Sequence, residues 1–267
     1  MSRKMHYEKG NEKGIGWDKI LFIIGAVLLI VYGCLQMKTM KDKEDYRKTI
    51  VRFEEIKADE GAKEETTIEM GKDESPESYQ KFFEMNKDMA GWLKIPGTQI
   101  DYPVMQTPQD EEYYLRRNFF GEKDNNGTLI LDTDSDITKT SNNLIIHGHN
   151  MKSGAMFGEL VDYEKEEFLK EHKKIEFHTK DEVRTYEVIA VFRSKVYTVE
   201  DKVFKYYQFF EAKTQEEFDS FYNNIKKMSL YDTGVTAEFG DEFITLSTCV
   251  YHTTNGRFVV VGRRITE

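Results

Sequence analysis

Hydrophobic positions along this chain form one long run near the N-terminus and many short runs beyond residue 92. The short runs are rich in β-branched and aromatic residues and are separated by turn residues, which is typical of β-strands. They lie at 92–95, 100–105, 128–131, 144–146, 175–177, 186–191, 243–250 and 257–265. Many strands at short spacing with few helices predict a mainly-β fold, a closed antiparallel barrel of about eight strands.

Two helices are predicted beside these strands, one at the N-terminal end of the folded part and a long one before the last two strands. Ser75, Pro76 and Glu77 supply a capping serine, a proline at the first helical position and an early acid. The apolar residues that follow within 79–85 form a face that we interpret as core packing rather than a ligand groove. The long helical pattern covers 215–228.

The long apolar run, 20–35, carries no charge, and with Gln36 and Met37 it reaches the lower limit of about 17 residues for a membrane-spanning helix. Basic residues before it favour a cytoplasmic N-terminus, although further basic residues follow it. We interpret the run as an uncleaved signal-anchor, because no small-x-small cleavage site follows. A cleaved secretory signal is the second hypothesis. A lipoprotein signal at Cys34 is the third, although Tyr32 is bulky for a lipobox.

These patterns divide the chain into four parts. We expect a cytoplasmic N-terminus at 1–19, a transmembrane signal-anchor at 20–37, a charged stalk or linker at 38–74 and a folded, extracellular domain at 75–267. Ile50, Phe53 and Ile56 recur at helical spacing, so part of the stalk is expected to be an amphipathic helix.

The net charge and the cysteine content limit the classes of function that the chain can have. The net charge of −10 argues against a nucleic-acid-binding protein, which needs a basic face to meet phosphates, and solubility explains the acidity more simply. The chain has two cysteines, Cys34 and Cys249. If Cys34 lies in a membrane, the two cannot form an intramolecular disulfide.

Cys249 ends a β-rich run, and Arg257 begins the next one. The thiolate is the reactive form of cysteine, and a neighbouring cation favours it, so Cys249 is a candidate nucleophile beside Arg257. Asn255-Gly256 is a strong signal for a two-residue hairpin. A tight turn there would set the two side chains about 17 Å apart. The catalytic interpretation requires a wide loop over 250–256, which lets Cys249 face Arg257 about 5 Å away.

Nucleophilic catalysis also needs a group that moves protons, which suits a histidine. His147 and His149 share one strand face if the strand extends that far. They could instead be metal ligands, with Asp132 or Asp134 beside them, but a histidine pair without a clear third ligand is weak evidence for a metal site.

Together these residues resemble the sortase family. The segment 245–249, Thr-Leu-Ser-Thr-Cys, resembles the TLxTC signature of sortases, and the serine in the middle is similar to class B. Further matches to class B sequences lie at 92–98, 100–104, 113–115, 127–132, 143–149 and 172–177. The resemblance covers about residues 79–267 and includes 257–261, Arg-Phe-Val-Val-Val, in the right order.

The resemblance implies a catalytic set of Cys249 as nucleophile, His149 as the catalytic histidine and Arg257 as the third member. His147 stands where relatives often carry another residue. The resemblance also implies residues that line the substrate groove: Leu115, Ser247, and Tyr206 or Tyr207. Val250 follows the cysteine where some relatives carry a polar residue.

The fold implied is the sortase-type barrel, and the activity implied is that of a membrane-anchored cysteine transpeptidase. Such an enzyme cleaves the C-terminal sorting-signal peptide of a surface protein after threonine. It then joins the acyl group to the amine of a peptidoglycan precursor. The resemblance implies neither a metal nor an organic cofactor, and no nucleic-acid partner.

Two other hypotheses are consistent with part of the pattern. A caspase-like cysteine endopeptidase would use His147 as its base, since a histidine followed by glycine and a downstream cysteine also fits that order. A non-enzymatic, membrane-tethered barrel that binds wall polymer or a partner protein would leave Cys249 as a buried core thiol.

Overall fold

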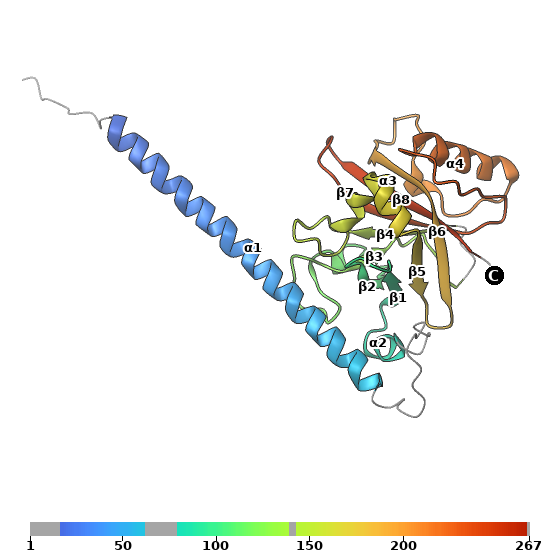
Figure 1. Ribbon diagram of the computed structural model, residues 1–267, viewed down its shortest axis with the longest axis horizontal. Coiled ribbons are helices and arrows are strands. Elements are labelled where there is room, and N and C mark those ends of the chain that lie inside the picture. The colour runs from blue at the N-terminus through green and yellow to red at the C-terminus, as the bar shows by residue number, and fades with distance from the viewer. Residues whose placement is uncertain (1–16, 62–78, 139–142, 266–267) are drawn as a thin grey trace, which may run out of the picture. The chain divides into compact units, whose positions relative to one another are not determined.

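The computed structural model describes residues 17–61, 79–138 and 143–265, and its main element is a closed barrel (Figure 1). The strands are β1 (Met89–Lys94), β2 (Asp101–Met105), β3 (Leu129–Leu131), β4 (Asn143–Gly148), β5 (Lys174–His178), β6 (Val183–Lys195), β7 (Phe243–Cys249) and β8 (Gly256–Arg264). Around the barrel their order is β1-β2-β3-β4-β7-β8-β6-β5, and β5 pairs with β1 to close it. The predicted closed barrel of about eight strands is confirmed.

Pairing directions in the barrel are mixed. The pairs β2–β3 and β4–β7 are parallel, and the remaining six pairs are antiparallel. Parallel neighbours need a long crossover connection, and the connection from β4 to β7 carries β5, β6 and the helix before β7. Hydrophobic alternation within a strand does not encode its partner, so the sequence pattern could not predict these two directions.

The described residues also form helices and short 3₁₀ turns. They are α1 (Trp17–Gly61), α2 (Gln80–Met85), η2 (Tyr113–Arg116), η3 (Glu159–Glu164), α3 (Glu166–Glu171), η4 (Tyr206–Gln208) and α4 (Gln215–Met228). The predicted long helix before the last two strands is α4. Thr214 and Glu217 form a capping box at its start, and Phe218, Phe221 and Ile225 are buried along one face.

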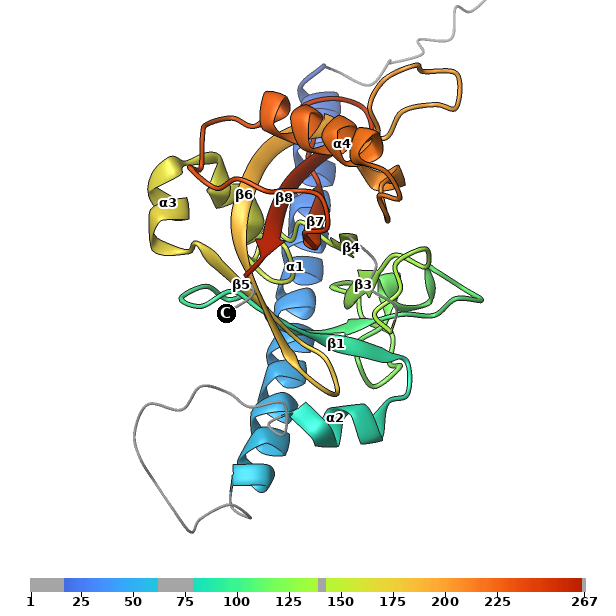
Figure 2. The ribbon, with the colours of Figure 1, turned by 90° about the vertical axis from the view of Figure 1, so that its right-hand side faces the viewer.

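The two faces of the barrel wall carry different residues. Leu144 and Ile146 of β4, with Leu246 of β7, belong to the cluster that fills the barrel. Residues that alternate with them point outward. Helix α4 lies beside β6 and β8 (Figure 2). Its buried residues Phe218, Phe221 and Ile225 form a second cluster with Val259 and Val261.

The N-terminal helix that the sequence pattern predicts for the folded domain corresponds to α2. The capping residues Ser75–Glu77 lie outside the described residues, and α2 covers Gln80–Met85. Tyr79, Phe82 and Phe83 are buried, as a core-packing face requires, whereas Met85 is exposed.

The chain divides into two compact units, Met1–Glu44 and Asp45–Glu267. Helix α1 starts in the first unit, where it is long and apolar enough to cross a membrane, with a mean hydropathy of 2.5 in its most apolar window. A signal sequence would show the same properties, so α1 is a weak candidate for a single membrane span. The second unit begins well before residue 75, where the sequence pattern starts the folded domain.

The end of α1 that belongs to the barrel unit is part of its core. Phe53, which is 5% exposed, contacts the rings of Phe82, Trp92, Phe119 and Phe120 at centroid distances of 5.3–5.8 Å. Half of the expected stalk therefore packs as an amphipathic helix on the domain that it was expected to carry.

We predict that Phe53→Ala lowers the free energy of unfolding of the unit 45–267 by about 3 kcal/mol, because the cavity left among four rings cannot fully collapse. Val51, on the same helix and 38% exposed, is the matched control, and Val51→Ala should cost about 0.5 kcal/mol or less. Denaturant titration measures both. Equal costs would contradict the packing of this helix on the barrel.

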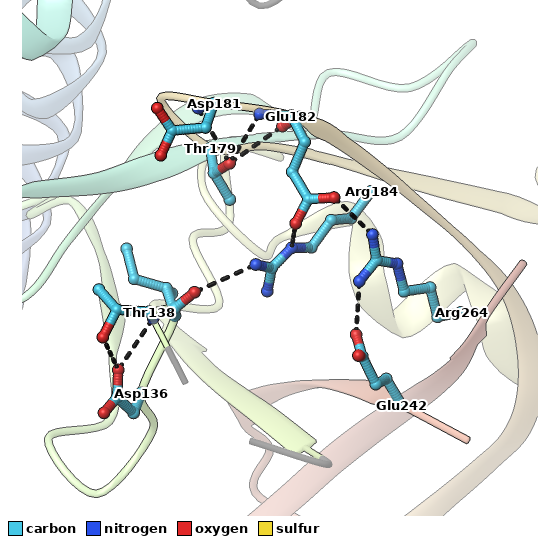
Figure 3. A network of polar contacts seen from close by, with 9 residues as sticks. Asp136, Thr138, Thr179, Asp181, Glu182, Arg184, Glu242 and Arg264 are labelled. Atoms are coloured by element: carbon cyan, nitrogen blue, oxygen red, sulfur yellow. Dashed lines mark hydrogen bonds and ion pairs between the residues drawn. The ribbon is translucent and has the colours of Figure 1, made fainter. Parts of the chain in front are cut away.

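An ion network joins the start of β6 to the end of β8 (Figure 3). The carboxylate of Glu182 accepts from Arg184 Nε at 2.6 Å and from Arg264 Nη2 at 2.6 Å. Arg264 Nη1 also donates to Glu242 at 2.7 Å, just before β7. Burial acts to raise the pKa of Glu182, but the hydrogen bonds and charges of the two arginines outweigh it, so this pKa lies below its ordinary value.

A lowered carboxyl pKa adds stability that is present above the pKa of the unfolded chain and is lost as the pH falls through the folded pKa. Glu182 is 41% exposed, so screening keeps its contribution to about 1 kcal/mol. We expect Glu182→Gln to lower the free energy of unfolding by that amount at pH 7, and the difference from wild type to shrink below about pH 4. Urea titrations at both pH values measure it, with Glu171→Gln on an exposed helix end as control. An offset that is the same at both pH values would contradict the ion-pair origin.

Candidate active site

Two neighbouring strands of the barrel, β4 and β7, end where a third strand, β8, begins. Strands β4 and β7 run parallel, and their last registered pair is Gly148 with Thr248. The next residues along the two strands are His149 and Cys249. Strand β8 runs antiparallel to β7 and sets Arg257 directly opposite Cys249. The register therefore brings the three predicted catalytic residues together, although His149 lies far from Cys249 and Arg257 in the sequence.

Strand alternation explains why these side chains point away from the barrel interior. Gly148, between the two histidines, faces inward, because a Cβ there would lie 2.5 Å from Leu129 and 2.6 Å from the ring of Phe157. Only glycine fits this close approach, so His147 and His149 are fixed on the outer face.

A wide loop connects β7 to β8. Val250 N donates to Gly256 O at 3.1 Å and so closes a loop over 250–256 rather than a two-residue turn. Asn255 has a φ of +57°, a conformation that asparagine tolerates, and its carbonyl accepts from Val196 N at 2.9 Å. Asn255 and Gly256 therefore lie at the end of the loop, where Asn255 adopts the left-handed conformation. The connection is the wide loop that the catalytic interpretation requires.

Cys249 presents a free, exposed thiol. Its backbone carbonyl accepts from Asn150 Nδ2 at 3.0 Å, which ties the end of β7 to the residue after His149. Asn150 is not among the site residues predicted from the sequence. Its position next to His149 was visible, but the contact depends on the parallel pairing of β4 with β7.

Arg257 is held at the base of the loop. Its Nη1 donates to Gly256 O at 3.1 Å and to Asn255 O at 3.4 Å. An arginine fork has five N–H donors, and within the part of the chain that the structure describes the remaining N–H groups of Arg257 have no protein acceptor. These donors are available to a negatively charged oxygen that forms next to the sulfur.

The imidazole of His149 is oriented by a backbone carbonyl. Its Nε2 lies 2.8 Å from Leu115 O in η2. A carbonyl only accepts hydrogen bonds, so Nε2 carries the proton. The second ring nitrogen, Nδ1, is then the one that exchanges a proton with a bound substrate.

A cavity of about 160 Å³ connects these groups, and residues from five elements or their ends line it: Leu115, Thr128, Ile130, His147, Gly148, His149, Ser247, Thr248, Cys249 and Arg257. Leu115 and Ser247, two of the predicted substrate-lining residues, are among them. Thr128 and Ile130 were not identified from the sequence, because only the pairing of β3 with β4 brings them to this face.

The two predicted tyrosines lie behind the cavity rather than in its lining. Tyr206 is 1% exposed, and its hydroxyl bonds to Ser247 Oγ at 2.7 Å. Burial raises the pKa of Tyr206 to about 12, so the hydroxyl stays neutral and supports the cavity floor from beneath. Tyr207 bonds through its hydroxyl to the backbone N–H of Tyr197 at 2.9 Å and holds the connection after β6.

His147 and His149 diverge in their contacts. His147 Nε2 lies 3.2 Å from Asp132 Oδ2, whereas His149 bonds to Leu115. Asp134 contributes its backbone N–H to Asp132 Oδ1 at 3.1 Å. Within 17–61, 79–138 and 143–265, no group of three or more His, Cys, Asp or Glu side chains is arranged to hold a metal ion.

Comparisons with known proteins agree with this geometry. Residues 93–265 match the model of the sortase domain family. Sortase B of Listeria monocytogenes is 35% identical over 185 residues, which cover 68% of this chain and 72% of the relative. Sortase B of Staphylococcus aureus is 26% identical over 252 residues, or 92% of this chain and 96% of the relative.

Among solved structures, one of sortase B from B. anthracis superposes with a TM-score of 0.69 at 29% identity, covering 85% of this chain and 100% of the other. A structure of Staphylococcus aureus sortase B gives a TM-score of 0.68 at 25% identity, covering 86% of this chain and 99% of the other. The chain belongs to the sortase family, in class B, and is thus a transpeptidase of the kind that anchors surface proteins.

Proposed function

We propose that this protein is a membrane-anchored cysteine transpeptidase that cleaves the sorting signal of a surface protein after threonine and joins the acyl group to a peptidoglycan amine. One observation carries the proposal. Cys249 at the end of β7, His149 just after β4 and Arg257 at the start of β8 line one cavity. A sulfur nucleophile, a proton carrier and a fixed cation in one cavity are the groups that acyl transfer through a thioester needs.

In the first step, the Cys249 thiolate attacks the threonyl carbonyl carbon. The carbonyl oxygen becomes negatively charged, and the free N–H groups of Arg257 hydrogen-bond to it. His149 donates a proton to the leaving amine as the carbon–nitrogen bond breaks. The products are a thioester on Cys249 and the released C-terminal peptide.

In the second step, the peptidoglycan amine attacks the thioester carbonyl. His149 accepts a proton from that amine, the carbon–sulfur bond breaks, and the thiolate of Cys249 is regenerated. The surface protein is then joined to the wall through a new amide bond. Slow hydrolysis occurs when no amine arrives.

Relatives support the class of donor substrate. One neighbour in structure is described as a Staphylococcus aureus sortase B–substrate complex. The apolar start of α1 supports membrane anchoring, with the N-terminus in the cytoplasm and the barrel outside. The caspase-like hypothesis lacks comparable support, because the chain belongs to the sortase family.

The test mixes the full chain in detergent micelles with a library of sorting-type peptides and a peptidoglycan-type amine, and measures the joined product by mass spectrometry. We expect a joined product from wild type. We also expect Arg257→Ala to lower kcat by about 10²-fold, as for the loss of an oxyanion donor. Arg257→Lys keeps the charge but loses the fork and should recover only part of the rate. Unchanged kcat in both variants would contradict the role of Arg257.

A further inference from the structure

The orientation of His149 depends on one backbone carbonyl. Its Nε2 donates to Leu115 O at 2.8 Å, and Leu115 lies in η2, which is followed by a loop over 117–128. This contact keeps one proton of the ring on Nε2 and leaves Nδ1 for proton exchange with a substrate. The contacts that hold η2 in place therefore bear on the proton transfer that His149 performs.

The loop after η2 fixes the peptide groups on both sides of the Leu115 carbonyl. Tyr114 O accepts from the backbone N–H of Thr128 at 3.1 Å. Arg116 O accepts from the backbone N–H of Asp124 at 3.0 Å. Because the carbonyl of Leu115 lies between these two bonded groups, its direction depends on the conformation of the loop.

Asn118 shapes this loop from within and joins it to the N-terminal helix. Its side chain is buried, and its Oδ1 accepts from the backbone N–H groups of Phe120 at 3.0 Å and of Glu122 at 3.1 Å. Its Nδ2 donates to Glu122 Oε2 at 2.8 Å and to Thr49 Oγ1 at 3.4 Å. Thr49 is a buried residue of α1, so a single amide connects the loop with that helix.

Arg52, one turn further along α1, provides a second connection to the loop. Its Nη1 donates to both carboxylate oxygens of Glu122, at 3.0 and 2.8 Å, and its guanidinium carbon lies 3.3 Å from the ring centroid of Phe120. The hydrogen bond from Asn118 lowers the pKa of Glu122, burial acts in the opposite sense, and the bond and charge of Arg52 lower it further. The carboxylate is therefore charged at neutral pH and holds the loop on α1.

We propose that Asn118 and Glu122 are positioning residues for His149, and that α1 contributes to catalysis through them. The contacts run from α1 to the loop, from the loop to the carbonyl of Leu115, and from this carbonyl to the imidazole. When the loop loosens, the carbonyl no longer fixes the ring, and His149 is less often oriented to reach the leaving amine. This inference rests on the proposed transpeptidase function, in which His149 donates a proton to that amine.

The experiment compares two substrates that share one acyl group and differ in the leaving group. The first is a peptide that gives a joined product in the library experiment, and its amine needs a proton as the carbon–nitrogen bond breaks. The second is the nitrophenyl ester of the same acyl group, whose nitrophenolate leaves with the electron pair of the carbon–oxygen bond and needs no proton. Single-turnover acylation of Cys249 is measured at saturating substrate, without an amine acceptor, on the full chain in detergent micelles. His149→Ala is the reference and should slow acylation by the peptide far more than acylation by the ester.

Asn118→Asp keeps the acceptor oxygen but replaces the amide donor with a second carboxylate facing Glu122. We expect it to slow acylation by the peptide about 10-fold and acylation by the ester less than about twofold. Adding Glu122→Gln to the same chain exchanges the two groups, since the new amide donates to the new carboxylate while its oxygen still accepts from Arg52. The peptide rate should then return to within about threefold of wild type.

Lys57→Gln is the matched control. Lys57 Nζ lies 3.3 Å from Asp101 Oδ2, so it also joins α1 to the barrel by an ion pair, but on β2 rather than on the loop. It should leave the ratio of the two acylation rates unchanged. If Asn118→Asp does not fold, Arg52→Gln replaces it, because Arg52 is 41% exposed and its loss is tolerated by the fold. Arg52→Gln should slow acylation by the peptide about 3-fold and leave acylation by the ester within about twofold of wild type.

The outcomes separate the two proposals. Equal slowing with peptide and ester, slowing with neither, no recovery on adding Glu122→Gln, or the same change of ratio in Lys57→Gln overturns the inference and leaves the transpeptidase intact. Absence of acylation of wild-type Cys249 by every peptide overturns the proposed function and the inference with it.

Discussion

Replacing Cys249 with alanine is expected to lower acyl transfer by about 10⁴-fold or more, to the level of the background reaction. Cys249 is the one thiol in the cavity of the described structure, and without its sulfur no thioester can form. The variant should keep its fold, because the thiol is exposed, so we expect its free energy of unfolding to stay within about 0.5 kcal/mol of wild type. Rates of joined-product formation and denaturant titrations measure the two effects.

Cys34→Ala is the matched control, since Cys34 is the other exposed free thiol and lies on α1. It should retain full transfer activity. If wild type formed no joined product and Cys249→Ala were indistinguishable from it, the hypothesis of a non-enzymatic barrel that binds wall polymer or a partner protein would be favoured instead.

The second large effect concerns the two neighbouring histidines. His149→Ala should lower kcat/KM for acyl transfer by about 10³-fold, because the leaving amine then lacks a proton donor. His147→Ala should lower it by no more than about tenfold, since no proton transfer in the proposed mechanism uses His147. Both histidines line the cavity, so the comparison tests the role of each ring rather than its location.

Initial rates at saturating and limiting peptide separate the two variants, with the His149 change acting on kcat. The opposite order, with His147→Ala the more severe change, would favour a caspase-like use of His147 as the base.

Local patterns in the sequence predicted those elements whose structure is decided by neighbouring residues. The helix α4 follows from a capping box at Thr214 and Glu217 and from apolar residues at helical spacing. The last two strands follow from runs of β-branched residues. The pairing partners of β2 and β4 are set by contacts between distant segments, so parallel neighbours could not be inferred from alternation.

The sequence pattern starts the folded domain at residue 75, whereas the compact unit begins at Asp45, for a related reason. Charged residues dominate 38–74, and the apolar positions Ile50, Phe53 and Ile56 are few. Their burial depends on a partner surface formed by Phe82, Trp92 and their neighbours, which lies beyond the connecting segment. A helix that is mostly charged can still be part of a core when its single apolar stripe meets such a surface.

The candidate site was predictable in its residue types and less so in its geometry. The sequence allowed either a tight two-residue turn or a wide loop between β7 and β8. Only the wide loop places Arg257 opposite Cys249. The choice is made by Val250, whose backbone closes the wide loop, and by Asn255, which turns the chain at its end. The link from Tyr206 to Ser247 and the pair of His147 with Asp132 need the folded barrel, because each joins residues from different elements.

The central claim is that the sulfur of Cys249 becomes covalently acylated and then gives up its acyl group to an amine. Intact-mass measurement of the full chain, mixed with a sorting-type peptide and no amine, tests it most directly. We predict a mass increase equal to the acyl fragment, mapped to Cys249 by digestion, and its disappearance with formation of a joined product once the amine is added. Cleaved peptide without an adduct on Cys249, or an adduct that the amine does not remove, would contradict the account.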